Sequence, residues 1–279
     1  MQKRIGVIGC GTIGSELALA IDKSQIKNAV IVFLYDTIIN ASLILRDKLH
    51  NNDPSLFSKF SQLTSSSSYK KADIIVEAAS QSAVKKFAKK IVSSNKSLMI
   101  MSTGALSNSK LLKELYSATI KHDSRIYIPT GAIAGIDAIC SAKHLLDSVM
   151  LTTTKNPKAL ASAPFFNLRN IKSENIKKRT LLYDGNAAAA VKMFPTNINV
   201  AVILGLAGLG TRRTRVRVIA DPHTNRNEHE IIAKGRFGEI TIVVSNIPSR
   251  HNPRTSFLAS LSAIECLRRI CDDNIRIGT

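Results

Sequence analysis

A short glycine-rich motif near the N-terminus restricts the possible folds of this chain more than any other feature. Gly9-Cys10-Gly11-Thr12-Ile13-Gly14 has the spacing G-x-G-x-x-G and lies between a β-rich run at residues 4–8 and a helical pattern at residues 12–21. Asp36 ends the next apolar run, twenty-two positions after Gly14. A strand, this spacing, a helix and an acidic residue about 20 positions further on together predict a dinucleotide-binding unit.

The residues of the motif have separate expected roles. Gly9 permits a tight turn, Gly11 lets the backbone approach a pyrophosphate, and Gly14 lets the helix pack closely on the strand. Thr12 and Ile13 begin the helix, whose unpaired N–H groups and positive dipole end favour an anion. The motif therefore predicts that the pyrophosphate of a cofactor binds at this helix N-terminus.

Asp36 predicts which cofactor is preferred. Its carboxylate would bind the adenosine ribose hydroxyls and would repel a 2′-phosphate. Thr37, Ile38 and Ile39 follow it, so no arginine is adjacent to bind that phosphate. We expect NAD as the cofactor, with NADP as the alternative.

Strand and helix patterns alternate through the first 130 residues, which predicts a Rossmann-type, doubly wound parallel sheet. The expected strands are residues 4–8, 29–35, 73–79, 97–102 and 125–128, and the expected helices are residues 12–21, 81–92 and 109–120. Residues 64–68 are rich in hydroxyl side chains and are expected to form a loop.

The pattern changes after Pro129 and predicts a second domain of the α+β class. Helices are expected at residues 134–145, 187–194 and 199–209, and strands at 148–154, 215–220, 228–233 and 239–244. Residues 155–185 show no clear pattern. The expected division is a dinucleotide-binding domain at 1–130, an α+β catalytic and dimerisation domain at 131–252, and a C-terminal helix within 253–279 that returns to the first domain.

The net charge of +19 is the unusual number in the composition, and it favours anionic partners. The basic residues are scattered, aromatic residues make up 5% of the chain and Trp is absent, so we expect a solvated basic surface and no sequence-specific nucleic-acid site. No apolar run is long enough for a membrane span. The four cysteines form no CxxC pair, so reduced thiols in a cytoplasmic protein and no metal site are expected.

His229 is the histidine that attracts attention. It lies in Asn227-Glu228-His229-Glu230-Ile231 at the start of an expected strand, where alternation would place both glutamates on the face opposite to the imidazole. The start of a zinc motif HExxH is present, but Ala233 stands at the second histidine position, so metal is rejected. From the local sequence alone, an ordinary strand histidine is at least as good an interpretation as a catalytic base.

Several further blocks, in order along nearly the whole chain, resemble the L-aspartate dehydrogenase family. The resemblance is weakest at residues 155–185, and Ala134 stands where the family has a second glycine. The similar blocks are Val76-Glu77-Ala78-Ala79-Ser80-Gln81, Ser102-Thr103-Gly104-Ala105, Gly131-Ala132-Ile133-Ala134-Gly135-Ile136-Asp137-Ala138, Leu151-Thr152-Thr153-Thr154-Lys155-Asn156, Phe194-Pro195-Thr196-Asn197-Ile198-Asn199-Val200-Ala201, His229-Glu230-Ile231 and Asn252-Pro253-Arg254-Thr255-Ser256.

The resemblance implies oxidation of L-aspartate with NAD to iminoaspartate, which hydrolyses to oxaloacetate and ammonia and can supply NAD biosynthesis. It also implies a homodimer formed through the second domain. Carried over by motif, His229 is the catalytic residue, and Ala132 and Asn199 contact the cofactor.

The remaining candidates follow from their positions and from the chemistry. Ala79, Ser80 and Thr103 follow expected strand ends, where ligands of such sheets bind. Loss of hydride from Cα requires a neutral amine, so a base that titrates near neutrality is needed, and imidazole suits this role. Lys155 and Asn197 are candidate partners for the substrate carboxylates, although Lys155 can equally form a structural ion pair.

Two alternatives remain at this point. One is another two-domain dehydrogenase or reductase, of the homoserine or dihydrodipicolinate type. The other is a basic nucleotide- or nucleic-acid-binding protein that keeps the fold without turnover, although the sequence contains no recognition helix, zinc finger or aromatic RNA motif.

Overall fold

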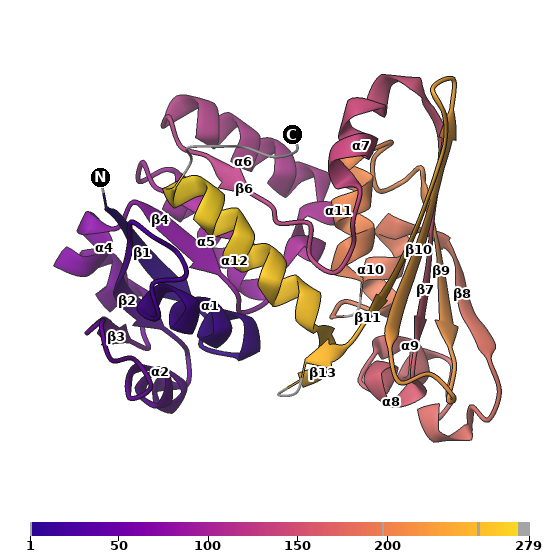
Figure 1. Cartoon of the computed structure of the whole chain (residues 1–279), viewed down its shortest axis with the longest axis horizontal. Coiled ribbons are helices and arrows are strands. Elements are labelled where there is room, and N and C mark those ends of the chain that lie inside the picture. The colour runs from indigo at the N-terminus through magenta and orange to yellow at the C-terminus, as the bar shows by residue number, and fades with distance from the viewer. Residues whose placement is uncertain (1, 197, 250–251, 273–279) are drawn as a thin grey trace. The chain divides into compact units, whose positions relative to one another are not determined.

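The computed structural model describes residues 2–196, 198–249 and 252–272. The chain divides into two compact units. One contains the chain up to Pro129 together with most of the C-terminal helix, from Ser260, and the other contains Thr130–Ala259. Each unit is a sheet with helices packed on it (Figure 1).

The first unit is built on a six-stranded sheet in the order β3-β2-β1-β4-β5-β6, and every pairing in it is parallel. The expected doubly wound parallel sheet is confirmed. Its strands are β1 (Lys3–Ile8), β2 (Ala29–Tyr35), β3 (Ser55–Phe57), β4 (Ile74–Glu77), β5 (Ser97–Ile100) and β6 (Ile126–Tyr127). The order reverses between β1 and β4, and this reversal places a ligand crevice beyond their carboxyl ends.

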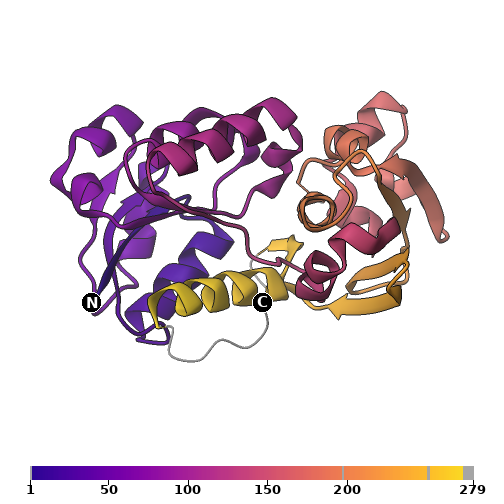
Figure 2. The ribbon, with the colours of Figure 1, turned by 90° about the horizontal axis from the view of Figure 1, so that it is seen from above.

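Helices cover both faces of this sheet, as continuous apolar strands require. Figure 2 shows the C-terminal helix, in yellow, on the same face as the indigo helix that follows β1, while the magenta helices lie on the other face. The helices of the unit are α1 (Thr12–Asp22), α2 (Ile39–Arg46), α3 (Phe60–Ser65), α4 (Ser67–Lys71), α5 (Gln81–Val92), η1 (Thr103–Ser107), α6 (Ser109–Lys121) and α12 (Phe257–Cys271).

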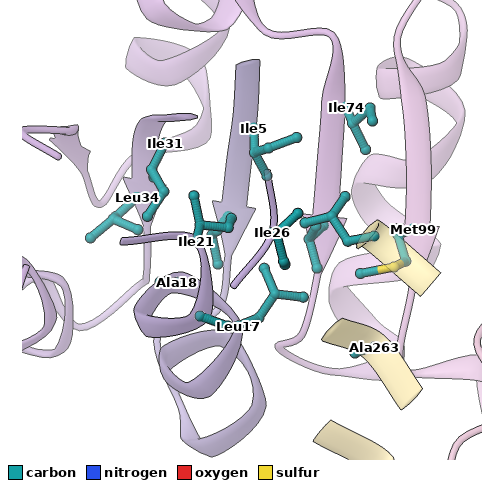
Figure 3. Close-up of a cluster of buried hydrophobic side chains, with 14 of the residues drawn as sticks. Ile5, Leu17, Ala18, Ile21, Ile26, Ile31, Leu34, Ile74, Met99 and Ala263 are labelled. Carbon is teal, nitrogen blue, oxygen red and sulfur yellow. The ribbon is translucent and has the colours of Figure 1, made fainter. Parts of the chain in front are cut away.

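The core under the first face joins residues that are distant in sequence. Leu17 and Ile21 of α1 pack with Ile5, with Met99 and with Ala263 of α12 (Figure 3). All five side chains are almost inaccessible to solvent. Burial of apolar surface of this kind contributes about 25 cal/mol per Å², so the last helix stabilises the first unit.

The expectation of a loop at residues 64–68 is wrong. The short helices α3 and α4 occupy this segment, and only Ser66 lies between them. The Ser66 hydroxyl accepts a hydrogen bond from the Tyr69 N–H, which caps α4. Leu63 and Tyr69 are buried, so packing of these two side chains overrides the local preference of serine and threonine for loops.

The basic surface residues behave as expected. Lys85, Lys86, Lys89 and Lys90 are all exposed on the outer side of α5. Arg215 and Arg217 also alternate with buried valines along one strand of the second unit, so both lie on the outer face of its sheet.

The second unit is built on a five-stranded mixed sheet in the order β11-β10-β7-β9-β8, so the expected α+β class is confirmed. Helices lie against one face of this sheet in both views (Figures 1 and 2). The strands are β7 (Leu146–Lys155), β8 (Thr180–Asn186), β9 (Thr214–Ala220), β10 (Asn227–Gly235) and β11 (Gly238–Asn246), and a separate pair is formed by β12 (Pro248–Ser249) and β13 (Asn252–Ser256).

Elements of the second unit differ from the expected ranges in a few places. The expected helix at 134–145 is divided into α7 (Ile136–Ser141) and η2 (Lys143–Leu145), and the unclear segment contains α8 (Pro157–Leu160), α9 (Pro164–Leu168) and η3 (Ser173–Asn175). The remaining helices are α10 (Ala187–Met193) and α11 (Asn199–Ala207). The hairpin β10–β11 turns between Gly235 and Gly238, as expected, and Gly238 has a φ of +118° that favours glycine.

Candidate active site

The glycine motif forms the turn between β1 and α1, and each glycine is required for a different reason. Gly9 has a φ of +97°, and a Cβ there would lie 2.7 Å from the backbone of Ala78. A Cβ on Gly14 would overlap the carbonyl oxygen of Gly9. A Cβ on Gly11 would meet no atom of the described residues within 4 Å, so Gly11 borders open space. A backbone that is open only at Gly11 suits the close approach of a pyrophosphate.

The N-terminus of α1 offers free donors at the same place. Gly11 is the N-cap residue, no side chain caps the helix, and its first turn contains no acidic residue. The N–H groups of Thr12 and Ile13 therefore lie at a positive helix end that no side chain caps. Ile13 packs its side chain against the core, which fixes this turn. The residues present fit the diphosphate of a dinucleotide.

Asp36 joins the glycine turn to the end of β2. Its carboxylate accepts a 2.8 Å hydrogen bond from the Cys10 N–H and a 3.0 Å bond from the Ile38 N–H. Two backbone donors use only part of the acceptor capacity of a carboxylate, so Asp36 can still accept from ribose hydroxyls. Burial raises the pKa of the Cys10 thiol to about 11, so this thiol stays protonated and unreactive at neutral pH.

A pocket of about 430 Å³ lies over this turn. Five of the expected cofactor residues line it: Gly9, Gly11, Asp36, Ala79 and Ser80. Lys86, on α5, lines the same pocket although it is fifty positions away from Asp36 in the sequence. Thr103 does not line it and is buried in η1.

In the second unit, His229 lies on the buried face of β10 and is 1% exposed. It is paired in register with Thr153 of β7, and the Thr153 Oγ1 lies 3.1 Å from the His229 Nδ1. Glu228 is half-buried and Glu230 is exposed on the opposite face, as strand alternation predicts. The Thr153 hydroxyl thus occupies one ring nitrogen and leaves Nε2 for other chemistry.

Lys155 shares this buried face, two positions after Thr153 on the same strand. It is 4% exposed, and burial lowers the pKa of its ammonium to about 8. Burial and, second, the positive charge of Lys155 lower the pKa of His229 to about 3. This pKa is far below the near-neutral value expected from the sequence, because both effects disfavour the imidazolium. The imidazole is therefore neutral at physiological pH.

Further polar groups lie at the same end of the second sheet. Asn246 ends β11 opposite Asn227 of β10, and its side-chain amide donates a 2.9 Å hydrogen bond to the carbonyl oxygen of Ala132. The neighbouring Gly131 lies against α11, because a Cβ there would be 4.0 Å from Val200. Asn199 is the first residue of that helix. Ala132 and Asn199 thus belong to the same unit, and Gly131, next to Ala132, lies beside the helix that Asn199 begins.

The substrate candidate Asn197 lies outside the described residues. No group of three or more His, Cys, Asp or Glu side chains that could bind a metal ion occurs in the part of the chain that the structure describes. Within the same described ranges, no helix is both long and apolar enough to cross a membrane.

Sequence reasoning missed four residues that the structure places at these sites. Strand register places Thr153 and Asn246 at the polar end of the second sheet. The packing of α5 places Lys86 at the pocket over the glycine turn. Glu77 accepts hydrogen bonds from the loops after β4 and β5, and the first of these loops lines that pocket. Glu77 and Thr153 belong to blocks that resemble the family, and this was the only signal available for them.

The parallel sheet, the glycine turn and the second α+β unit define the class of two-domain, nicotinamide-dependent dehydrogenases. A family model described as "Homoserine dehydrogenase, NAD binding domain" matches residues 9–129, and one described as "Aspartate dehydrogenase, C-terminal" matches residues 137–270. The match to homoserine dehydrogenase thus concerns the nucleotide-binding part.

Similar proteins narrow this class further. The L-aspartate dehydrogenase of Nitrosopumilus maritimus is 45% identical, and the match covers 100% of both chains. The crystal structure of the aspartate dehydrogenase of Thermotoga maritima matches with a TM-score of 0.74 at 25% identity, over 100% of both chains. A myo-inositol dehydrogenase of Lactobacillus casei, solved with NAD(H) and myo-inositol, shares only the fold, with a TM-score of 0.52 at 12% identity over 100% of this chain and 89% of that chain. The chain belongs to the L-aspartate dehydrogenase family.

Proposed function

We propose that this protein oxidises L-aspartate with NAD to iminoaspartate, which hydrolyses to oxaloacetate and ammonia. The observation that carries the proposal is the buried His229, held by Thr153 and placed beside a buried lysine, in a chain of this family. A bound nicotinamide supplies the hydride acceptor. The residues of the chain must then bind a dicarboxylate, remove a proton from its amine and position both reactants.

His229 is the proposed base. An ammonium has no lone pair to assist departure of hydride from Cα, so the amine must first lose a proton. With Nδ1–H donated to the Thr153 hydroxyl, the Nε2 lone pair accepts that proton, and after Nε2 has released it to solvent the same nitrogen can accept a proton from the water that attacks the imine. The hydrogen bond to Thr153 fixes the ring orientation, and in the proposed tautomer the Thr153 hydroxyl accepts it from Nδ1–H.

Lys155 is the proposed partner of a substrate carboxylate, together with Asn197. With a pKa of about 8, Lys155 is mostly cationic at neutral pH and attracts an anion. A carboxylate that pairs with Lys155 also cancels the positive charge that lowers the pKa of His229. Substrate binding would therefore make the imidazole a stronger base at the moment when a base is needed.

The cofactor preference is proposed to be NAD over NADP, because Asp36 faces the pocket with a carboxylate that repels a 2′-phosphate. Lys86 lines the same pocket, and its positive charge can pair with the 2′-phosphate of NADP. NADP is therefore expected to bind, although more weakly than NAD. We expect Lys86→Ala to lower kcat/KM with NADP and to leave the value with NAD nearly unchanged. Lys85→Ala, on the same helix and outside the pocket, is the control. A higher catalytic efficiency of the unmodified protein with NADP than with NAD would contradict the proposed preference.

The proposed assembly is a homodimer formed through the uncovered face of the second sheet. This face exposes Leu181 and Val243, which are 54% and 68% exposed, next to the half-buried Ile219 and Ile232. Sedimentation of the purified protein tests this assembly. A cytoplasmic location is proposed because all four cysteines are free thiols. The iminoaspartate that the reaction forms is proposed to serve as a precursor in NAD biosynthesis.

The direct test is formation of NADH by the purified protein with L-aspartate, compared with L-homoserine, L-glutamate and D-aspartate. We expect the highest kcat/KM with L-aspartate. Preference for any of the other three compounds would contradict the proposed substrate.

A further inference from the structure

A buried glutamate at the carboxyl end of β4 takes no part in the proposed chemistry. Glu77 is 3% exposed, and its carboxylate accepts four hydrogen bonds. The N–H groups of Ala79 and Ser80 donate at 2.9 Å each, and the N–H and the hydroxyl of Ser102 donate at 3.1 Å and 2.9 Å. Hydrogen bonds to a charged acceptor are stronger than neutral ones, so this is a firmly held junction.

The four donors belong to two different loops. Ala79 and Ser80 form the loop between β4 and α5, and both line the pocket over the glycine turn. Ser102 follows β5 and is the N-cap residue of η1. One side chain thus joins two consecutive loops at the carboxyl edge of the parallel sheet, where a dinucleotide binds in such sheets.

The first of these loops also touches the glycine turn. A Cβ on Gly9 would lie 2.7 Å from the Ala78 backbone, and the Ala78 N–H donates a 2.8 Å hydrogen bond to Ile8. A shift of the loop after β4 therefore changes the opening between this loop and the turn that faces the pyrophosphate.

Both carboxylate oxygens of Glu77 must act as hydrogen-bond acceptors to hold the two loops. The Glu77 Oε1 accepts from Ala79, from Ser80 and from the Ser102 hydroxyl, and the Oε2 accepts from the Ser102 N–H. Burial raises the pKa of Glu77, and the four donors oppose this rise by stabilising the anion. A glutamine keeps the shape but places an NH2 donor against an N–H donor, and this contact would release one loop.

We propose that Glu77 is a positioning residue for the dinucleotide, because it joins the loops after β4 and β5 in the spacing that cofactor binding requires. This inference rests on the proposed function only in taking a nicotinamide dinucleotide as the ligand of the pocket.

The same unit contains a matched control. Asp22 is also 3% exposed, and its carboxylate accepts hydrogen bonds from the N–H groups of His50 and Asn51 and from the side chain of Asn52, at 2.8–2.9 Å. It ends α1, at the end of the helix away from the glycine turn, and does not line the pocket. Asp22→Asn thus reports the structural cost of disturbing a buried carboxylate junction, without an effect on cofactor placement.

The experiment measures the Kd for NADH by fluorescence titration and the Tm by thermal unfolding for the unmodified protein, Glu77→Gln and Asp22→Asn. Both variants are expected to have a lower Tm. Glu77→Gln should raise the Kd at least about tenfold, whereas Asp22→Asn should change it less than about twofold. An unchanged Kd in Glu77→Gln, or an equal increase in both variants, would overturn the proposal.

Ser102→Ala keeps the test decisive if Glu77→Gln does not fold. This variant removes one hydrogen bond to Glu77 and leaves the backbone bond in place. We expect a Kd for NADH about three times higher, and an unchanged Kd would overturn the proposal. If the unmodified protein binds NADH but does not oxidise L-aspartate, the proposed function is wrong. The Kd values of the variants still decide whether Glu77 positions the dinucleotide.

Discussion

The pocket over the glycine turn and the polar end of the second sheet are built from different parts of the chain. The pocket in the first unit lies over a backbone turn that three glycines and a helix N-terminus shape, and the side chains of Asp36 and Lys86 also line it. The polar end of the second unit is formed by side chains on three neighbouring strands, with His229, Thr153 and Asn246 at its centre. The first arrangement suits binding of an anion by N–H groups, and the second suits transfer of a proton.

The difference also determines how a substitution acts. A change in the pocket alters the space or the donors available to a ligand. A change at the polar end alters the protonation or the orientation of one ring. We therefore expect variants of the first region to change cofactor affinity and variants of the second to change turnover.

The largest expected effect comes from His229→Ala. Loss of the proposed base should lower kcat by about 10²–10⁴-fold, the usual range for general acid–base catalysis. The Kd for NADH should hardly change, because the proposed dinucleotide site is the pocket over the glycine turn with Asp36, and His229 does not line it. Steady-state rates of NADH formation and a fluorescence titration measure both quantities.

His223→Ala is the control for this variant, since His223 is exposed and follows Asp221 in a turn. It should retain normal turnover. Near-normal turnover of a folded His229→Ala protein would show that the residue assignment is wrong, even if the aspartate reaction is correct.

Gly11→Ala tests the other region with the next largest effect. Gly11 has a φ of −76°, which alanine adopts readily, and the added Cβ meets no described atom within 4 Å. The protein should therefore keep its Tm. The Kd for NADH should rise about 10–100-fold, because the methyl group displaces a pyrophosphate from one hydrogen bond to the helix N-terminus, worth about 1.5–3 kcal/mol. An unchanged Kd for NADH would show that the cofactor does not bind at the glycine turn.

The titration of Lys155 gives an effect of about tenfold per pH unit. Its ammonium has a pKa of about 8, so the positive charge is present below that pH and is lost above it. The inhibition constant of succinate, a dicarboxylate without an amine that titrates in this range, should rise about tenfold per unit above pH 8. Lys155→Met should bind succinate weakly at all pH values. A flat profile in the unmodified protein would indicate that Lys155 has a structural role.

Thr153→Val has the smallest of these effects. Valine has nearly the same shape as threonine but removes the hydroxyl that lies 3.1 Å from the His229 Nδ1. We expect kcat to fall about three- to tenfold, because one buried hydrogen bond of about 0.5–1.5 kcal/mol is lost. Thr153→Ser retains the hydroxyl and should recover most of the activity. Equal activity of both variants would show that the Thr153 hydroxyl does not orient the His229 ring.

The same contrast explains what the sequence could predict. The glycine turn, Asp36 and the alternation of the first sheet follow from short-range spacing, and all three have the expected structure. The face on which His229 lies also followed from strand alternation. Its contact with Thr153 could not be predicted, because it depends on the register of two strands separated by 76 positions.

Two other features show why local patterns fail. Residues 64–68 read as a loop, because serine and threonine favour loops, yet buried Leu63 and Tyr69 fold them into helices. The pKa of His229 depends on burial and on Lys155, neither of which is visible in the pentapeptide around it. Properties set by long-range packing thus required the structure.

The central claim is that cofactor binding and proton transfer depend on separate regions of the chain. Its most direct test is one set of measurements, the Kd for NADH and the single-turnover rate at saturating NAD and L-aspartate, on Gly11→Ala and His229→Ala side by side. We predict that Gly11→Ala raises the Kd but retains most of the saturated rate, and that His229→Ala retains the Kd but loses the rate by about 10²–10⁴-fold. If both variants lost affinity and rate in the same proportion, the two regions would not be separable and the account would be contradicted.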